Sequence, residues 1–133
     1  MKNSDRHQIV LVVEDEGIVR ETSAQELMDA GYEVLEAESA EKALAILKAG
    51  ATVAVLFTDV NMPGQLDGLD LAHLVHKRWP AVRLIVTSGG GRVAPKDVPD
   101  DGRFLAKPYR LGHLTTLVEE LTEFEAPEDP PDR

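Results

Sequence analysis

Apolar residues along the chain gather in five short runs, and polar residues follow each run. The runs occupy residues 9–13, 33–37, 53–57, 82–86 and 104–106. Most of them are continuous in hydrophobicity rather than alternating, which is typical of strands that belong to a parallel sheet and are buried on both faces. The pattern therefore predicts five strands in one parallel sheet.

Apolar residues at helical spacing occupy most of the stretches between these runs. We expect helices over about residues 16–30, 40–50, 68–79 and 111–124. Ser39 is a typical N-cap for the second helix, and Pro80 ends the third. Residues 89–102 contain three consecutive glycines and two prolines, so a helix in this stretch must be short or irregular. Alternating strands and helices predict an α/β fold with helices on both faces of the sheet.

The length and the composition indicate one domain. The chain has 133 residues, of which 43% are hydrophobic, and this is enough for one core without disulfides. We expect a polar N-terminal arm over residues 1–8, a folded domain over residues 9–124, and a disordered, charged and proline-rich tail over residues 125–133.

Charge and cysteine content limit the functional classes. The formal net charge is -10, which argues against a protein that binds nucleic acid through the phosphate backbone. The absence of cysteine suits a reducing compartment. No apolar run approaches the roughly 18 residues that a membrane-spanning helix needs. We therefore expect a cytoplasmic protein with no direct nucleic-acid partner and no membrane partner.

Chemically active residues follow four of the five predicted strands. Two acids, Glu14 and Asp15, follow the first strand, and Asp59 ends the third. Ser88 ends the fourth strand and Lys107 follows the fifth. Right-handed crossovers place the carboxyl ends of parallel strands at the same edge of a sheet. We therefore expect these five side chains to meet in one crevice.

Three neighbouring carboxylates cannot all remain ionised without a compensating charge, so this edge predicts a cation site. Oxygen ligands favour Mg²⁺, Ca²⁺ or Mn²⁺, and Mg²⁺ leaves room for a phosphate oxygen. Lys107 and Ser88 offer an ammonium group and a hydroxyl to phosphoryl oxygens. An aspartate beside a divalent ion and a lysine can accept a phosphoryl group, which makes Asp59 the candidate nucleophile.

Each of these residues also has a simpler interpretation. Glu14 and Asp15 can cap the following helix, Ser88 can be a turn hydroxyl, and Lys107 can be a solvated charge. Their positions at strand ends favour the functional interpretation. The glycines at 89–91 resemble a phosphate-binding loop, but the lysine and hydroxyl residue that end such a loop do not follow them. We interpret these glycines as a flexible turn.

Over residues 9–124 the chain resembles the receiver domain of two-component response regulators, and five segments in order carry the resemblance. The segments are Val12 to Glu16, Phe57 to Gly64, Asp67 to Leu69, Val86 to Gly89 and Phe104 to Tyr109. One segment alone would be a weak signal, whereas five at successive strand ends are specific. The resemblance implies a flavodoxin-like, doubly wound sheet of five parallel strands in the order 2-1-3-4-5.

The resemblance also implies how the site works. Asp59 would accept a phosphoryl group from the phosphohistidine of a sensor histidine kinase or of a histidine phosphotransfer protein, and a downstream protein partner would respond. Asp15, Asp59 and the backbone carbonyl of Asn61 would bind Mg²⁺, with Glu14 assisting. The module would be no enzyme in the usual sense, because it would catalyse only its own phosphorylation and dephosphorylation.

The remaining implied roles concern the switch and the lysine. Ser88 would be the switch hydroxyl, because a small residue follows it. Lys107 would bind the phosphoryl oxygens, and the bond between Lys107 and Pro108 is expected to be cis. Phe104 occupies a position that the family often fills with the switch tyrosine, so the aromatic ring is present and the hydroxyl is absent. The stretch between Ser88 and Phe104 is a few residues shorter than usual, and the loop over residues 63–68 is one residue longer.

Two other functions compete with a stand-alone phosphorylated switch. A small phosphatase with an aspartate nucleophile also places an acid after an apolar strand, but such enzymes carry a second acid two positions later, where this chain has Asn61. A receiver that serves only as a binding scaffold is the other competitor, and the intact acids, hydroxyl and lysine argue against it. Within the receiver family, a phosphotransfer intermediate or a phosphate sink in a phosphorelay is the main alternative role.

Overall fold

Strands and helices alternate along the chain. The computed structural model describes residues 8–90, 93–99, 102–110 and 112–125. Its elements, in order, are β1 (Ile9–Val13), α1 (Gly17–Asp29), β2 (Glu33–Ala37), α2 (Ala40–Lys48), β3 (Val55–Asp59), α3 (Gly68–Arg78), β4 (Arg83–Ser88), the 3-10 helix η2 (Pro95–Asp97), β5 (Arg103–Ala106) and α4 (His113–Glu125).

All five strands belong to one sheet, with the order β2-β1-β3-β4-β5 and parallel pairing throughout. This is the doubly wound topology that the sequence predicted. The register brings strand ends level with one another, because Asp59 pairs with Thr87 and Ser88 pairs with Ala106. The carboxyl ends of β1, β3, β4 and β5 therefore lie side by side at one edge of the sheet, where the polar residues of the sequence follow.

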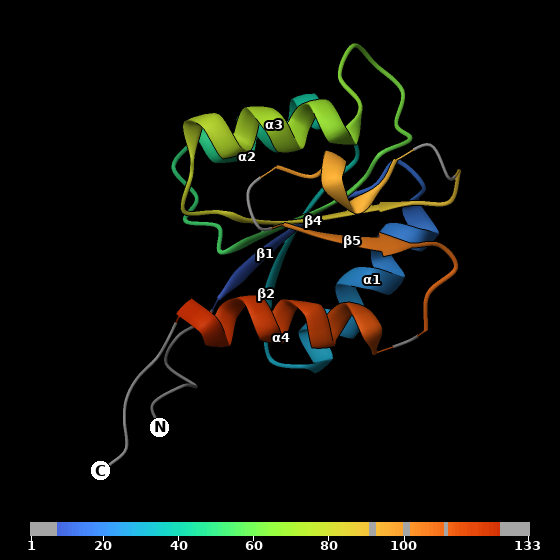
Figure 1. Cartoon of the computed structure of the whole chain (residues 1–133). Helices are drawn as coiled ribbons and strands as arrows, with labels where there is room; N and C mark the ends of the chain where they lie inside the picture. The colour runs from blue at the N-terminus through green and yellow to red at the C-terminus, as the bar shows by residue number, and fades with distance from the viewer. Residues whose placement is uncertain (1–7, 91–92, 100–101, 111, 126–133) are drawn as a thin grey trace.

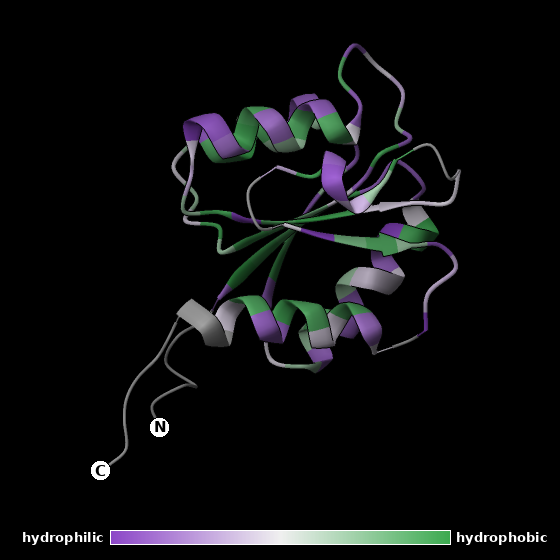
Figure 2. Ribbon diagram, viewed as in Figure 1, coloured by the Kyte–Doolittle hydropathy of each residue, from purple (hydrophilic) through white to green (hydrophobic). Residues whose placement is uncertain are grey.

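Helices cover both faces of the sheet (Figure 1). The helices α2 and α3 lie with η2 on one face, and α1 lies beside α4 on the other. Most residues of the strands are apolar, and α2, α3 and α4 turn apolar sides toward the sheet (Figure 2). Each face has its own buried cluster, with Leu56, Leu71 and Val86 among the members on the α2–α3 side, and Phe57, Leu27 and Leu114 among those on the α1–α4 side.

Polar caps fix where the helices on the α2–α3 side begin. The Ser39 hydroxyl accepts a hydrogen bond from the backbone N–H of Lys42 at 3.1 Å, as the sequence predicted for an N-cap. Asp67 and Asp70 form a reciprocal capping box at the start of α3, with N···O distances of 2.8 and 3.1 Å. The cap sets the start of α3 beside the end of β3, which carries Asp59.

The structure refines several expected boundaries. The connection between β4 and β5 contains η2 in its described part, in agreement with the prediction of a short or irregular helix. The strand β3 begins at Val55, two residues later than the apolar run, and α4 extends to Glu125. The expected N-terminal arm, apart from Gln8, and residues 126–133 of the expected tail lie outside the described residues. In the described part of the chain, each helix is too short or too polar to cross a membrane.

Candidate functional site

Three acids meet at the carboxyl edge of the sheet, where β1 and β3 end. Carboxylate oxygens of Glu14, Asp15 and Asp59 all lie within 4.8 Å of one another. Glu14 and Asp59 are each 5% exposed, whereas Asp15 is exposed to solvent. The sequence predicted this cluster because β1 and β3 are neighbours in the sheet. The arrangement is open to solvent at Asp15 and closed at the other two acids.

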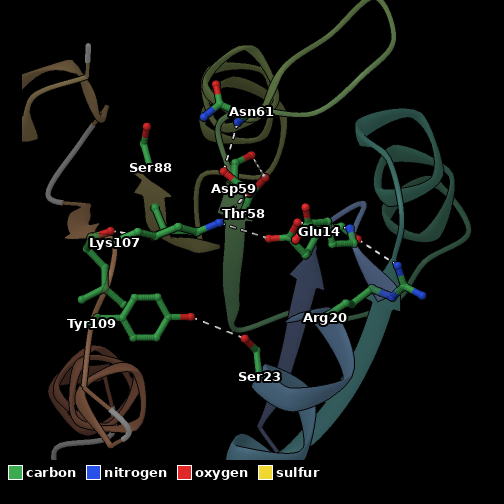
Figure 3. A network of polar contacts seen from close by, with 12 residues as sticks. Glu14, Arg20, Ser23, Thr58, Asp59, Asn61, Ser88, Lys107 and Tyr109 are labelled. Atoms are coloured by element: carbon green, nitrogen blue, oxygen red, sulfur yellow. Dashed lines mark hydrogen bonds and ion pairs between the residues drawn. The ribbon is translucent and has the colours of Figure 1, made fainter. Parts of the chain in front are cut away.

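Lys107 reaches this cluster from the end of β5, and its side chain extends across the edge of the sheet (Figure 3). Its Nζ lies 2.8 Å from Asp59 Oδ2 and 3.6 Å from Glu14 Oε1. The backbone N–H of Lys107 donates to the carbonyl of Ser88 at 3.1 Å, which ties the start of this segment to β4. The bond to Pro108 is cis, the isomer expected from the sequence. The ammonium group is thus held against the candidate nucleophile.

The charges at the site perturb one another. Burial raises the pKa of Glu14 from 4.5 to about 7, although the backbone N–H of Glu16 opposes the shift, and Asp59 adds to it. Burial alone would lower the pKa of Lys107, but its hydrogen bond to Asp59 and the two nearby carboxylates raise it above 10.5. Among the described residues, the Lys107 ammonium group contacts two of the three acids of the cluster, Asp59 and Glu14.

The loop after β3 holds Asp59 from its other side. The backbone N–H of Asn61 donates to Asp59 Oδ1 at 3.1 Å, so both carboxylate oxygens of Asp59 accept a hydrogen bond. The Asn61 side chain points away from the acids (Figure 3). Gly68 begins α3 directly against β3, and a Cβ atom at this position would lie 1.8 Å from the backbone oxygen of Asp59. The close approach requires glycine at the start of α3.

The two predicted switch residues lie in neighbouring strands, Ser88 at the end of β4 and Phe104 in β5. Ser88 is 4% exposed, and its Oγ accepts a hydrogen bond from Gly90 N–H at 3.3 Å. Figure 3 shows no hydrogen bond between the Ser88 hydroxyl and Asp59. Phe104 pairs with Val86 in the sheet and is partly buried against the cluster on the α2–α3 side.

Sequence reasoning missed two residues that support the site. Arg20 of α1 donates from Nη1 to the backbone carbonyl of Glu14 at 2.9 Å and from Nε to Glu36 at 3.1 Å. Tyr109 places its hydroxyl 3.5 Å from Ser23 Oγ and its ring edge-on to Phe57, with 6.4 Å between the ring centroids. The position of Arg20, one helical turn into α1, was the available signal for the first contact. Nothing in the spacing of Tyr109 predicted the second.

The residues at this edge fit a divalent cation. The ligand atoms of the three acids are carboxylate oxygens, which suit Mg²⁺, Ca²⁺ or Mn²⁺. The three acids include no sulfur or imidazole ligand of the kind that would favour zinc. In the described part of the chain, the Lys107 ammonium group forms its shortest ion pair with one of the three acids, Asp59. Asp15 and Asp59 would hold the ion, and Glu14 lies close enough to assist.

The comparison with protein families decides what kind of module this is. The model for the response regulator receiver domain matches residues 10–119, which is most of the chain. The chain belongs to the receiver domain family. This receiver domain is 38% identical over 118 residues to the sensor kinase CckA of Brucella abortus, a match that covers 86% of this chain and 12% of the kinase. It is 29% identical to the response regulator receiver protein CpdR of the same organism, over 84% of this chain and 94% of CpdR.

Solved structures share the fold of this receiver domain. The response regulator receiver protein from Sinorhizobium medicae superposes with a TM-score of 0.80 at 27% identity, over 87% of this chain and 94% of that one. The response regulator TrrA from Thermotoga maritima, in complex with Mg²⁺ and BeF, superposes with a TM-score of 0.74 at 26% identity, over 86% and 98% of the two chains. The five-stranded parallel sheet with helices on both faces is therefore the receiver fold.

Proposed function

We propose that Asp59 accepts a phosphoryl group from a phosphohistidine of a sensor histidine kinase or a histidine phosphotransfer protein, in a reaction that requires Mg²⁺. The observation that carries the proposal is the contact of Lys107 Nζ with Asp59 Oδ2 at 2.8 Å beside two further acids. A buried carboxylate that touches a lysine and adjoins a cation site has the surroundings of a phosphoryl acceptor.

The phosphoryl transfer would begin at the carboxylate of Asp59. A carboxylate oxygen of Asp59 attacks the phosphorus, the P–N bond to the imidazole breaks, and its electron pair stays on the departing ring nitrogen. A mixed anhydride forms on Asp59. Lys107 is placed to hold an equatorial phosphoryl oxygen, and the Asn61 N–H keeps the carboxylate oriented. Mg²⁺, when bound, would supply the positive charge that offsets the carboxylates and the phosphoryl oxygens.

Phosphorylation would then change which protein partner binds. The phosphoryl group adds negative charge and acceptor oxygens next to Ser88, whose hydroxyl can leave Gly90 N–H and donate to one of them. The two hydrogen-bonding states of Ser88 would bias two conformations of the domain, and a partner that binds one of them better would read the phosphorylation. The signal would act in the cytoplasm through protein contacts rather than through nucleic acid.

Two arrangements of this receiver domain are compatible with that chemistry. In the first, the domain works alone as a response regulator, which the match to nearly the whole of CpdR supports. In the second, it passes the phosphoryl group on or stores it within a phosphorelay, which the match to one part of CckA supports. We propose the first arrangement as the role of the domain and the second as its alternative.

A labelling experiment tests the proposal. The protein is incubated with a small phosphodonor such as acetyl phosphate, with Mg²⁺ or with a chelator. We expect one phosphoryl group per chain with Mg²⁺, and a loss of at least about tenfold in rate with chelator or in Asp59→Asn, because the nucleophile or its cation is removed. The control is Asp29→Asn, at an exposed acid of α1. Equal labelling of wild type and Asp59→Asn would refute the proposal.

A further inference from the structure

We infer that Ser23 and Glu26, on the inner face of α1, are positioning residues that set the place of Lys107 at Asp59. The two residues lie one helical turn apart, so their side chains share a face of the helix. Each contacts a residue of the chain that follows Lys107. The inference rests on the proposed function, because it assigns the positioning of the lysine that would contact the phosphoryl group.

The first contact joins Ser23 to Tyr109, two residues after Lys107. Ser23 is 6% exposed, and its Oγ lies 3.5 Å from the Tyr109 hydroxyl, at the outer limit for such a hydrogen bond. The Tyr109 ring also packs edge-on against Phe57, which lies two residues before Asp59 in β3. Figure 3 shows Tyr109 directly below the Lys107 side chain, reaching toward α1. The aromatic ring is thus anchored to the acceptor strand and to α1.

The second contact joins Glu26 to the start of α4. Gly112 precedes α4 and its carbonyl accepts the first helical hydrogen bond from Thr116, but glycine has no side chain to cap the exposed N–H groups. Glu26 Oε2 supplies the cap, because it accepts from Gly112 N–H at 2.9 Å, from Thr115 N–H at 3.3 Å and from the Thr115 hydroxyl at 2.9 Å. A carboxylate at a helix N-terminus is also favoured by the helix dipole.

Together the two contacts restrain where the Lys107 backbone can lie. On one side, its N–H is fixed to Ser88 of β4. On the other side, Tyr109 and Gly112 are held by α1. The Lys107 side chain is long and 31% exposed, so the position of Nζ depends on where its backbone is held as well as on its contact with Asp59. A shift of about 1 Å at a contact made in the transition state is enough to slow a reaction measurably.

The test compares two double variants of the same helix. Ser23→Ala with Glu26→Ala removes both inner contacts. The double variant Thr22→Ala with Gln25→Ala is the matched control. In the described part of the chain, the Thr22 hydroxyl donates to the Ile18 carbonyl and the Gln25 amide donates to Asp29, so both side chains bond within α1. With acetyl phosphate and saturating Mg²⁺, we expect the maximal labelling rate to fall roughly 3- to 10-fold in the inner variant and less than about 1.5-fold in the control.

Two measurements separate positioning from a general loss of structure. Mg²⁺ affinity of the inner variant, measured by calorimetry, should stay within about twofold of wild type, because Asp15 and Asp59 are untouched. In a Lys107→Ala background, the inner substitutions should slow labelling less than about 1.5-fold further, since the residue that they position is gone. An equal fall in rate with and without Lys107, or a parallel loss of Mg²⁺ affinity, would overturn the inference.

A readout without phosphoryl transfer keeps the inference separate from the proposed function. The rate at which an N-hydroxysuccinimide ester acylates Lys107, followed by peptide mass spectrometry, reports how firmly the ammonium group is paired. We expect about 2- to 5-fold faster acylation in the inner variant, and a smaller increase in Tyr109→Phe, which loses one oxygen and keeps the ring. An unchanged acylation rate in both variants would reject the inference, even if Asp59 were shown to be the acceptor. If Asp59 were not the acceptor, faster acylation would still support the restraint on Lys107.

Discussion

Glu14 is the acid at the site whose pKa is raised by its surroundings. It is buried beside Asp59, and only its contact with Lys107 and the N–H of Glu16 favour the ionised form. A carboxyl group with a pKa near 7 is charged only part of the time at neutral pH in the metal-free protein. A bound cation would favour the ionised form, so protonation of Glu14 and binding of the ion would oppose each other.

This environment predicts how stability depends on pH. Between pH 4.5 and about 7, Glu14 is protonated in the folded protein and ionised in the unfolded chain. The stability that comes from the protonated form is therefore complete below pH 4.5 and is lost as the pH rises through 7. In chelator, we expect Glu14→Gln to be about 1–2 kcal/mol more stable than wild type at pH 8 and equal to it near pH 4.5.

Urea unfolding at the two pH values measures this difference. Glu16→Gln, at an exposed neighbour, is the control and should change neither value by more than about 0.5 kcal/mol. A stabilisation by Glu14→Gln of the same size at pH 4.5 and pH 8 would show that packing, and not ionisation, is responsible.

At the scale of elements, the junction between β3 and α3 sets the place of Asp59, the proposed acceptor. Gly68 donates its N–H to the carbonyl of Val60 at 3.0 Å, and its Cα faces the backbone of Asp59. The capping box of Asp67 starts α3 at this point. The position of Asp59 therefore depends on a helix start that tolerates no side chain.

A pair of glycine substitutions at helix starts tests this dependence. Gly68→Ala should destabilise the protein by at least about 2 kcal/mol and slow the labelling of Asp59, because the new methyl group collides with the backbone oxygen of Asp59. Gly17 also begins a helix, but the nearest atom to a Cβ there is 3.8 Å away. Gly17→Ala should change stability by less than about 0.5–1 kcal/mol, in either direction.

Thermal unfolding and labelling with acetyl phosphate measure both effects. Similar stability of the two variants would contradict the close packing of α3 against β3.

The elements also show which parts of the site the sequence could predict. Asp59, Lys107, Glu14 and Asp15 were found because Asp59 ends a strand and the others follow one, and parallel strands fix where their ends meet. The support of Lys107 by Ser23, Tyr109 and Glu26 was not found, because it depends on how α1 and α4 pack together and on the reach of individual side chains. The glycines and prolines between β4 and β5 predicted that any helix there must be short or irregular, and composition alone did not locate η2.

At the scale of the whole molecule, different structural elements lie near the site on the two faces of the sheet. On one face, hydrogen bonds join the segment after Lys107 to α1, from Tyr109 to Ser23 and from Gly112 to Glu26. On the other face, the described part of the connection between β4 and β5 contains η2, and Phe104 packs there without a hydroxyl. Asp59 is thus linked to the α1–α4 face through Lys107 and the segment that follows it.

The identity of the phosphorylated residue tests the central claim most directly. The protein is treated with acetyl phosphate and Mg²⁺ and then with borohydride, which reduces an acyl phosphate on aspartate to homoserine, and its peptides are sequenced by mass spectrometry. We predict homoserine at position 59 and at no other acid, with none in samples treated with chelator. Reduction at Asp15 or Glu14 instead, or a stable phosphoryl group on a histidine with position 59 unchanged, would contradict the account.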